Sequence, residues 1–455
     1  MAVLRLELKI HKNIPETFHR LGVIVSSKRA KLLLLREKRH KWARTGTRYW
    51  LNHYFYSKKQ HSYMRELLAL MTFLVFLGPM VNGQDHPPGR IICASPSEKL
   101  YTGSPSILVL SNGDYLASHD FFGPKAIENG GLGTTRIFVS TDKGKHWRLR
   151  TTIKGQFWST LFQHKGSVYI FGTRGGVNDC VIRRSNDMGQ TWSEPNNSET
   201  GLLLPKNGNM GYHCAPMPVS IHAGRIWRAF EYTPDKGWGQ FQSLMLSADT
   251  SADLLNAKSW TSSNRLTFDM NWQKDYTCWL EGNAVATPTH QMVNILRVNF
   301  KGDDIAAMAN VSEDGTNISF NPTTGFIGLP GGCKKFSIRY DGVSKRYWSL
   351  ANYAPIAEKE KAKLINHALE RARNTLVLIS SEDLIHWKNH CTVLYSPDIK
   401  QHGFQYADWT IENNDIIAAV RTAYGEKTDG SHDANYITFH RIKHFRKKLK
   451  KEIDD

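Results

Sequence analysis

The sequence predicts an all-β fold, a six-bladed β-propeller of four-stranded antiparallel blades. One motif of Ser, Asp, Gly and Trp recurs five times, with copies that start 45, 62, 65 and 69 residues apart. Short apolar runs punctuated by turn residues fill the intervals, and the chain contains 13 Trp and 35 Gly. A repeated unit of this length with about four short strands closes most simply into a propeller.

The repeated motif is typical of a hairpin turn that follows an apolar strand. Its full copies run from Ser140 to Trp147 and from Ser185 to Trp192, and looser copies begin at Ser247, Ser312 and Ser381. In such a turn Gly adopts the positive φ, the Asp and Ser oxygens accept amide hydrogens, and Trp packs beneath the hairpin. We therefore expect the motif to be structural and to lie at the outer rim of the propeller.

The amino-terminal part does not share this pattern. Residues 1–63 contain 15 Lys or Arg against 3 Asp or Glu, without an apolar periodicity long enough for a domain. Residues 64–83 have the layout of a secretory signal peptide: a basic start at Arg65, an apolar run of 11 residues from Leu67 to Leu77, and small residues before an expected cut after Gly83. A run of this length is too short to span a bilayer comfortably.

These features predict where the mature protein begins and where it acts. We expect translation to start at Met64, so that residues 1–63 are not part of the mature protein, residues 64–83 are removed, and residues 84–455 form the propeller of a secreted or periplasmic protein. The alternative is a basic cytoplasmic segment followed by an uncleaved anchor. Without residues 1–63 the net charge falls from +18 to +6, so the basic pI does not predict nucleic-acid binding.

All six Cys residues lie in residues 84–455, where export allows oxidation. Their spacing does not fit a metal site, so we expect one or two disulfides and neither a metal ion nor another cofactor. A core of this size does not need the disulfides for stability.

The 372 residues after Gly83 give 62 per blade, in agreement with the spacing of the motif. Apolar runs and turn signals place the six blades at Ser104–Thr152, Trp158–Trp192, Tyr212–Trp260, Trp279–Phe320, Lys335–Tyr395 and Phe404–Phe445. Arg90–Ala94 precedes the first blade and is expected to pair with the sixth, which closes the ring and removes an exposed edge. Charged residues and Ala between Lys359 and Arg371 predict a helical insert in blade five.

The turn repeats resemble the Asp-box (BNR) repeats of the sialidase superfamily, whose members have six blades. A ligand pocket on a propeller lies on the axis, at one end of the innermost strands. Segments that are similar to the family's site occur there in three blades: Trp279–Asn283 with Val293–Arg297, Arg373 eight residues ahead of Ser381, and Gly403–Asp408. The resemblance implies that Tyr406 is a nucleophile partnered by Glu281, and that Arg297 and Arg373 bind a substrate carboxylate.

Two positions depart from the family pattern. Ser104 stands in a segment where the family has its first arginine, and Thr134 stands where it has an acid/base Asp. His119 and Asp120 leave the second strand of blade one toward the axis. A carboxylic acid in a desolvated cleft has a raised pKa and can protonate a leaving oxygen, so Asp120, Asp433 or a His can replace the missing acid.

The candidate residues draw on five blades. The catalytic candidates are Tyr406, Glu281, Asp120 and His119. The candidate substrate-binding residues are Arg297, Arg373, Arg421, His213, His432, Asp433 and Asp408. Lys334, Lys335 and His402 also enter inner strands. A Tyr attacks an anomeric carbon only when a neighbouring base takes its proton, which is the role expected of Glu281.

The resemblance, together with the expected signal peptide, implies an exported, exo-acting glycoside hydrolase that removes a terminal, acidic sugar, because paired arginines suit a carboxylate. Its expected partner is a glycan or oligosaccharide substrate, with no nucleic acid and no stable membrane insertion after signal cleavage. Two alternatives remain open. One is a carbohydrate-binding propeller without turnover, and the other is a polysaccharide lyase in which Tyr406 or a His takes a proton from a uronate.

Overall fold

The computed structural model describes residues 4–5, 24–25, 86–129, 132–234, 239–302, 304–425 and 428–450. The chain divides into two units, Met1–Asn82 and Gly83–Asp455. In the first, strands β1 (Leu4–Arg5) and β2 (Ile24–Val25) pair antiparallel. The rest of the expected extension and the whole expected signal segment 64–83 lie outside the described residues. No helix within these ranges is long and apolar enough to cross a membrane.

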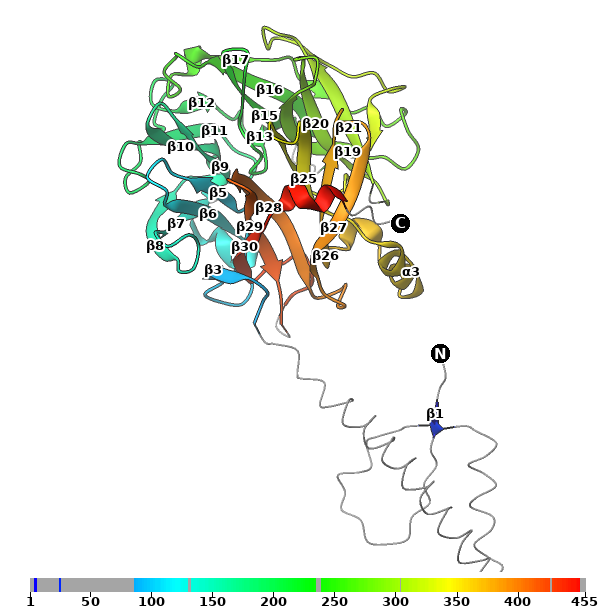
Figure 1. Ribbon diagram of the computed structural model, residues 1–455. Helices are drawn as coiled ribbons and strands as arrows, with labels where there is room; N and C mark the ends of the chain where they lie inside the picture. Colours follow the sequence, from blue (N-terminus) through cyan, green and yellow to red (C-terminus); the bar gives the residue numbers. More distant parts are fainter. Residues whose placement is uncertain are drawn as a thin grey trace, which may run out of the picture. The chain divides into compact units, whose positions relative to one another are not determined.

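From residue 86 onward, the described chain forms six antiparallel sheets around a central axis, so the predicted propeller is confirmed (Figure 1). Blade one contains β4 (Tyr101–Thr102), β5 (Ser106–Val109), β6 (Tyr115–Phe122), β7 (Thr134–Ser140) and β8 (Arg148–Lys154). Blade two contains β9 (Phe157–His164), β10 (Ser167–Thr173), β11 (Cys180–Ser185) and β12 (Leu202–Leu204). Blade three contains β13 (Gly211–His213), β14 (Ser220–His222), β15 (Arg225–Thr233), β16 (Gln242–Asp249), β17 (Trp260–Ser262) and β18 (Leu266–Thr267).

Blades four to six complete the ring. Blade four contains β19 (Cys278–Ala286), β20 (Met292–Asn299), β21 (Ile305–Val311), β22 (Ile318–Ser319) and β23 (Phe326–Gly328). Blade five contains β24 (Ser337–Asp341), β25 (Arg346–Asn352), β26 (Thr375–Ser381) and β27 (Trp387–Tyr395). Blade six contains β28 (Gly403–Glu412), β29 (Asp415–Ala423) and β30 (Tyr436–Ile442). The helical segments are η2 (Pro124–Asn129), η3 (Ala257–Ser259), α3 (Ile356–Leu364), η4 (Leu369–Arg371) and η5 (Phe445–Lys450).

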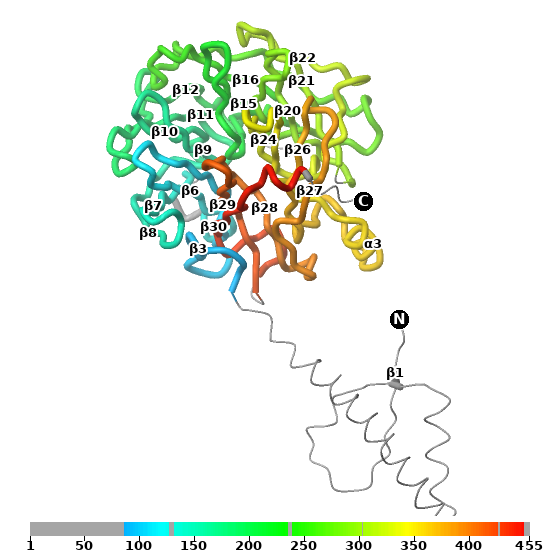
Figure 2. The backbone as a smooth tube through the Cα atoms, in the orientation of Figure 1, coloured from blue at the N-terminus to red at the C-terminus, as the bar shows by residue number. Residues whose placement is uncertain are grey.

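The ring closes as the sequence predicts. Strand β3 (Arg90–Ala94) pairs antiparallel with β30 and becomes the outermost strand of blade six. Figure 2 shows β3 in blue beside β30 at the red end of the chain. The expected helical insert in blade five is present, and it begins at Ile356 rather than Lys359. The outer strand of blade two, β12, lies beyond the expected end at Trp192.

The turn motif has the contacts expected of it in blade two. The Ser185 hydroxyl donates to the Asp187 carboxylate at 2.7 Å and accepts the Gly189 amide hydrogen at 2.8 Å. Asp187 accepts the Thr191 amide hydrogen at 2.9 Å, and the Trp192 indole donates to the Gly189 carbonyl at 3.2 Å. Gly189 has φ of 87°. These groups are satisfied within the turn, which fits a structural role.

The hydrophobic core of the described chain includes six large clusters, each between neighbouring blades, and two smaller ones around Phe241 and Ala362. Large buried side chains mark them, for example Phe171 with Phe230, Trp227 with Trp279, and Trp348 with Trp409. Because each sheet packs between two others, its central strands are buried on both faces and are nearly continuous apolar runs. Strand β29 shows this pattern, because Ile-Ile-Ala-Ala-Val at 416–420 is apolar and buried throughout.

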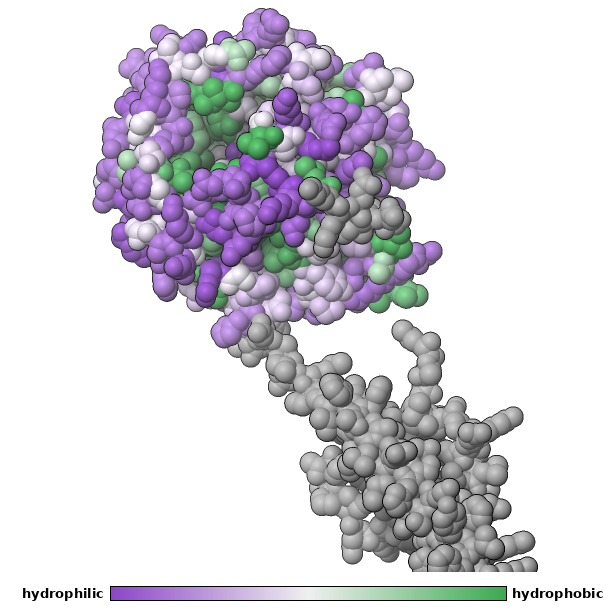
Figure 3. Space-filling model, in the orientation of Figure 1, coloured by the Kyte–Doolittle hydropathy of each residue, from purple (hydrophilic) through white to green (hydrophobic). Residues whose placement is uncertain are grey.

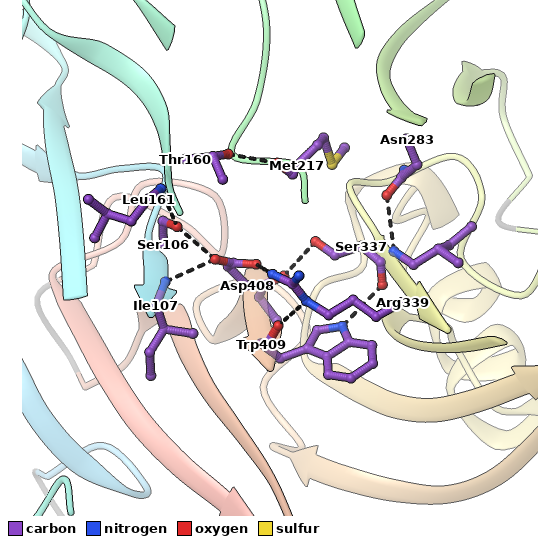
Figure 4. Close-up of polar contacts among 12 residues, drawn as sticks. Ser106, Ile107, Thr160, Leu161, Met217, Asn283, Ser337, Arg339, Asp408 and Trp409 are labelled. Atoms are coloured by element: carbon purple, nitrogen blue, oxygen red, sulfur yellow. Dashed lines mark hydrogen bonds and ion pairs between the residues drawn. The ribbon is translucent and has the colours of Figure 1, made fainter. Parts of the chain in front are cut away.

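Polar side chains near the axis tie the inner strands of different blades together (Figure 4). The Thr160 hydroxyl donates to the Met217 carbonyl at 2.7 Å, which joins blade two to blade three. The Asn283 side chain accepts the Ile338 amide hydrogen at 3.0 Å, which joins blade four to blade five. Each of these polar residues lies on an even-numbered blade and contacts the blade that follows it.

The expected disulfides are wrong, because all six Cys residues are free thiols. Cys180 and Cys214 share the apolar cluster between blades two and three. The Cys214 thiol donates to the Trp158 carbonyl at 3.2 Å, and burial raises the pKa of Cys214 to about 12. These thiols pack as small apolar groups, as buried free Cys commonly does.

Candidate functional site

Tyr406 and Glu281 meet at the axis, although they lie on blades six and four. The Tyr406 hydroxyl donates to one oxygen of Glu281 at 2.7 Å, and Arg297 donates to the other oxygen at 3.0 Å. Burial disfavours the charged form of Glu281, but the charges of Arg297 and His213 outweigh it and hold the pKa of Glu281 below its usual value. Burial and the charge of Glu281 raise the pKa of Tyr406. The pair therefore joins a protonated phenol to an ionised carboxylate.

Both residues have a backbone conformation that side chains other than Gly rarely adopt. Glu281 has φ of 56° and Tyr406 has φ of 52°. Each lies in a bulge, where the register of its strand shifts between Leu280 and Asn283 or between Gln405 and Asp408. A left-handed residue of this size costs about 1–2 kcal/mol, and such strain is concentrated at functional sites.

Trp158 is a third residue of this kind, and sequence reasoning missed it. It has φ of 48° near the start of β9, beside another register irregularity, so blades two, four and six each carry one left-handed inner-strand residue. The Trp158 ring packs edge-on against His213 at 4.4 Å between ring centroids. Because His213 acts electrostatically on Glu281, Trp158 lies near the same site. We name Trp158, Glu281 and Tyr406 the corner residues.

Two further arginines surround the Tyr406 phenol. The Arg421 guanidinium lies 4.9 Å from the centroid of the Tyr406 ring and donates to the His432 carbonyl at 2.5 Å. Arg373 is 7% exposed, and burial and the charge of Arg297 lower its pKa to about 10. Arg373 Nη1 and Arg421 Nε are buried and have no hydrogen-bond partner among the described residues. Unsatisfied buried donors of this kind favour an anionic ligand.

The structure separates the two candidates on β6. Asp120 accepts the Trp158 amide hydrogen at 2.7 Å, and its other oxygen is buried without a partner in the described chain. Burial raises the pKa of Asp120 to about 7, against the opposing effects of that amide and of the Arg421 charge. The His119 ring instead packs against Phe121 and Phe138, and burial lowers its pKa to about 4. Asp120 thus touches a corner residue, whereas His119 lies in the packing of blade one.

His213, His432 and Asp433, three other predicted site residues, lie next to the cluster around Tyr406. His213 lies 2.8 Å from the Glu231 carboxylate, and the opposite oxygen of Glu231 accepts the Gly282 amide hydrogen at 3.1 Å. His432 pairs with Asp433 at 2.7 Å, and their half-exposed side chains lie at the rim beside Arg421. These residues border the cluster around Tyr406.

Asp408 is not part of that cluster. Its carboxylate accepts the Ser106 hydroxyl at 2.8 Å, the Ile107 amide hydrogen at 2.9 Å and an Arg339 guanidinium hydrogen at 3.1 Å (Figure 4). It is fully buried, and these contacts join blade six to blades one and five. Ser106 belongs to the segment that begins at Ser104, where the sialidases have an arginine. Its hydroxyl connects blade one to blade six. Arg421 of blade six lies beside Tyr406 and adds a third positive charge to those of Arg297 and Arg373.

A separate hollow of about 830 Å³ lies at the opposite end of the inner strands. Its lining includes Ala286 at the end of β19 and Ile411 near the end of β28, whereas Glu281 and Tyr406 lie near the starts of these strands. Figure 3 shows the propeller with a largely hydrophilic rim and apolar side chains toward its middle. The described residues contain no group of three or more His, Cys, Asp or Glu placed to hold a metal ion.

No protein-family model matches the sequence, and no curated protein matches it. Solved structures do: an α-L-arabinanase of Penicillium chrysogenum complexed with arabinobiose has 14% identity and a TM-score of 0.50, with 78% of this chain and 98% of that chain covered. The leech intramolecular trans-sialidase complexed with 2,7-anhydro-Neu5Ac has 12% identity and a TM-score of 0.51, with 79% and 70% covered. Trypanosoma rangeli sialidase has 13% identity and a TM-score of 0.50, with 77% and 56% covered. At these identities the similarity establishes the fold, and the resemblance to sialidases holds at that level.

Proposed function

We propose that this protein is a glycoside hydrolase that removes a terminal acidic sugar from glycans. The observation that carries the proposal is the 2.7 Å contact between Tyr406 and Glu281, enclosed by Arg297, Arg373 and Arg421. Structural neighbours that include an arabinanase and sialidases support a carbohydrate substrate. We place the hydrolase outside the cell, as a chain that begins at Gln84. The mass of the amino-terminal peptide of the exported protein tests that start.

The mechanism begins with proton transfer from Tyr406 to Glu281. The phenolic oxygen then bonds to the anomeric carbon as the glycosidic bond breaks, and the leaving oxygen takes a proton from Asp120. The raised pKa of Tyr406 makes the adjacent base necessary, and Arg297 keeps that base ionised. Water, deprotonated by Asp120, next attacks the anomeric carbon and releases Tyr406, which recovers its proton from Glu281. Tyr nucleophiles of this kind are a known exception to the two-carboxylate rule.

The arginines define the charge of the sugar. Arg373 Nη1 and Arg421 Nε are buried donors without a partner among the described residues, so a carboxylate between them gains two charge-assisted hydrogen bonds. Arg297 already donates a hydrogen bond to Glu281, so part of its hydrogen-bonding capacity is not free for a substrate carboxylate. A neutral sugar would leave both donors unsatisfied at a cost of about 1–3 kcal/mol each.

The proposal is tested by incubating the purified protein with oligosaccharides that end in sialic acid, in a uronic acid or in a neutral pentose. We expect release of a free acidic sugar and none of the pentose. An unsaturated uronate that absorbs in the ultraviolet would instead establish a lyase. Binding measured by calorimetry without any product would establish a carbohydrate-binding propeller.

Asp120 gives the reaction a defined pH dependence. Because burial raises the pKa of Asp120 to about 7, the acid is protonated below that pH and is lost above it. We expect kcat to fall as the pH rises through 7, and Asp120→Asn to lower kcat by about 100-fold or more and to remove this limb of the profile. Initial rates between pH 5 and 9, on the substrate that the panel identifies, measure both effects.

A substrate with a good leaving group provides the control. Its departure needs no proton, so an aryl glycoside of the same sugar should show a much smaller loss in the first step with Asp120→Asn. His119→Asn on the same strand should leave the pH profile unchanged. An alkaline limb that persists in Asp120→Asn would exclude Asp120 as the acid.

A further inference from the structure

The backbone at or next to each corner residue is held by an ionisable side chain from the preceding blade. Asp120 of blade one accepts the amide hydrogen of Trp158 at 2.7 Å. Glu231 of blade three accepts the amide hydrogen of Gly282, next to Glu281, at 3.1 Å. The bulges in blades two and four are therefore fixed by buried carboxylates. In blade six the side chain that holds the bulge is a cation instead of a carboxylate.

That cation is Lys335, which lies two residues before β24, the first strand of blade five. Its ammonium donates to the carbonyl of Ala407, next to Tyr406, at 2.7 Å and to the Ser337 hydroxyl at 2.6 Å. Ser337 itself donates to the same carbonyl at 3.2 Å. Lys335 is 2% exposed, and the two oxygens that accept from its ammonium, the Ala407 carbonyl and the Ser337 hydroxyl, are both neutral. A buried ammonium without an ion-pair partner is costly, so its position requires an explanation.

The bulge supplies that explanation. In β28 the pairing passes from Gln405 opposite Arg421 to Asp408 opposite Ala419, so Tyr406 and Ala407 share one place in the ladder. The Ala407 carbonyl accepts from Lys335 and Ser337 across the blade boundary, and without these donors it would be a buried, unsatisfied acceptor. The backbone would then relax toward ordinary strand geometry, which turns the Tyr406 side chain. The Tyr406 contact with Glu281 depends on the same backbone.

We propose that Lys335 is a positioning residue that fixes the β28 bulge and thereby aims the Tyr406 hydroxyl at Glu281. The effect on turnover rests on the proposed role of Tyr406, whereas the effect on the Tyr406–Glu281 distance does not. Burial, opposed by the charges of Asp408 and Glu281, lowers the pKa of Lys335 to about 8, in keeping with a site fully enclosed by protein.

Lys335→Met tests the proposal because Met keeps the length of the side chain and removes its charge and donors. We expect kcat to fall about 100-fold, the effect of a displacement of about 1 Å, with KM within about threefold because the arginines remain. We expect a crystal structure of the variant to show the Tyr406 hydroxyl beyond hydrogen-bond distance of Glu281. Lys335→Gln, which restores a donor, should recover part of the rate.

Lys334→Met is the matched control. Lys334 is equally buried, but it donates to the Leu369 carbonyl at 3.0 Å rather than to β28. Its replacement should lower the melting temperature comparably and leave kcat within about threefold. If Lys335→Met does not fold, Ser337→Ala removes the second donor to Ala407 and takes its place in each measurement.

The outcomes separate the two hypotheses. An intact Tyr406–Glu281 hydrogen bond in the Lys335→Met crystal structure overturns the positioning role, as does a rate loss equal to that of Lys334→Met. If the unmodified protein turns over no glycan, the proposed function fails. The crystal structures then still decide whether Lys335 fixes the bulge.

Discussion

Tyr406→Phe is expected to abolish turnover and to leave sugar binding intact. The substitution removes only the oxygen that donates to Glu281 at 2.7 Å, and the ring that packs beneath Arg421 remains. Removal of a nucleophile typically lowers kcat by about 10⁴-fold or more. Arg373 and Arg421 keep their donors, so the dissociation constant of the acidic product should change by less than about threefold. Single-turnover kinetics and calorimetry measure the two quantities.

The control for this experiment lies in the same blade. Tyr424 stacks on His402 at 4.2 Å between ring centroids, and Tyr424→Phe removes a hydroxyl of the same kind. It should retain nearly full activity. Glu281→Gln should be about as inactive as Tyr406→Phe, and the double variant no worse than either, because members of one catalytic unit act non-additively. A fully active Tyr406→Phe protein would exclude Tyr406 as the nucleophile.

The fold could be predicted from sequence because its signals are local. The motif from Ser185 to Trp192 satisfies its own hydrogen bonds, so it specifies a turn wherever it occurs, and its spacing gives the length of a blade. The closing strand Arg90–Ala94 follows from the need to cover the edge of blade six. The disulfides could not be predicted, because pairing depends on distances between thiols that spacing along the chain does not give.

The site could be predicted only in part, because a strand pattern does not reveal a bulge. In a regular strand Tyr406 and Asp408 would point to the same face, and sequence reasoning placed both in the pocket. The register shift between Gln405 and Asp408 separates them, so that Tyr406 meets Glu281 and Asp408 meets Ser106. A one-residue shift reverses the face of every side chain that follows.

Trp158 could not be predicted from the sequence, because the corner residues share a backbone geometry and not a side-chain pattern. Thr160, Asn283 and Asp408 each follow a corner residue by two positions, and each bonds to the next blade. This repeat is of residue role and backbone geometry, since the three side chains are chemically different. Each bulge therefore directs the corner residue to the end of the axis where Tyr406 meets Glu281, and it directs the polar residue two positions later to the boundary with the next blade.

Asp408→Ala is expected to be the most destabilising single change in the link between blades. It removes the acceptor of the Ser106 hydroxyl and the Ile107 amide hydrogen and leaves the Arg339 guanidinium without its carboxylate. Breaking one partner of a buried ion pair costs about 3–5 kcal/mol in the free energy of unfolding. Asp408→Asn keeps an acceptor oxygen and should cost less. Denaturant unfolding of the two variants and the unmodified protein measures the order.

Asp433 distinguishes this structural role from ligand binding. Its carboxylate pairs with His432 at the half-exposed rim, so Asp433→Asn should change the free energy of unfolding by less than about 1 kcal/mol. Acidic-sugar binding by folded Asp408→Asn should equal that of the unmodified protein, because Asp408 is fully buried between blades. If Asp408→Asn instead weakened sugar binding while its unfolding midpoint stayed unchanged, Asp408 would belong to the substrate site after all, and the bulge in β28 would not separate it from Tyr406.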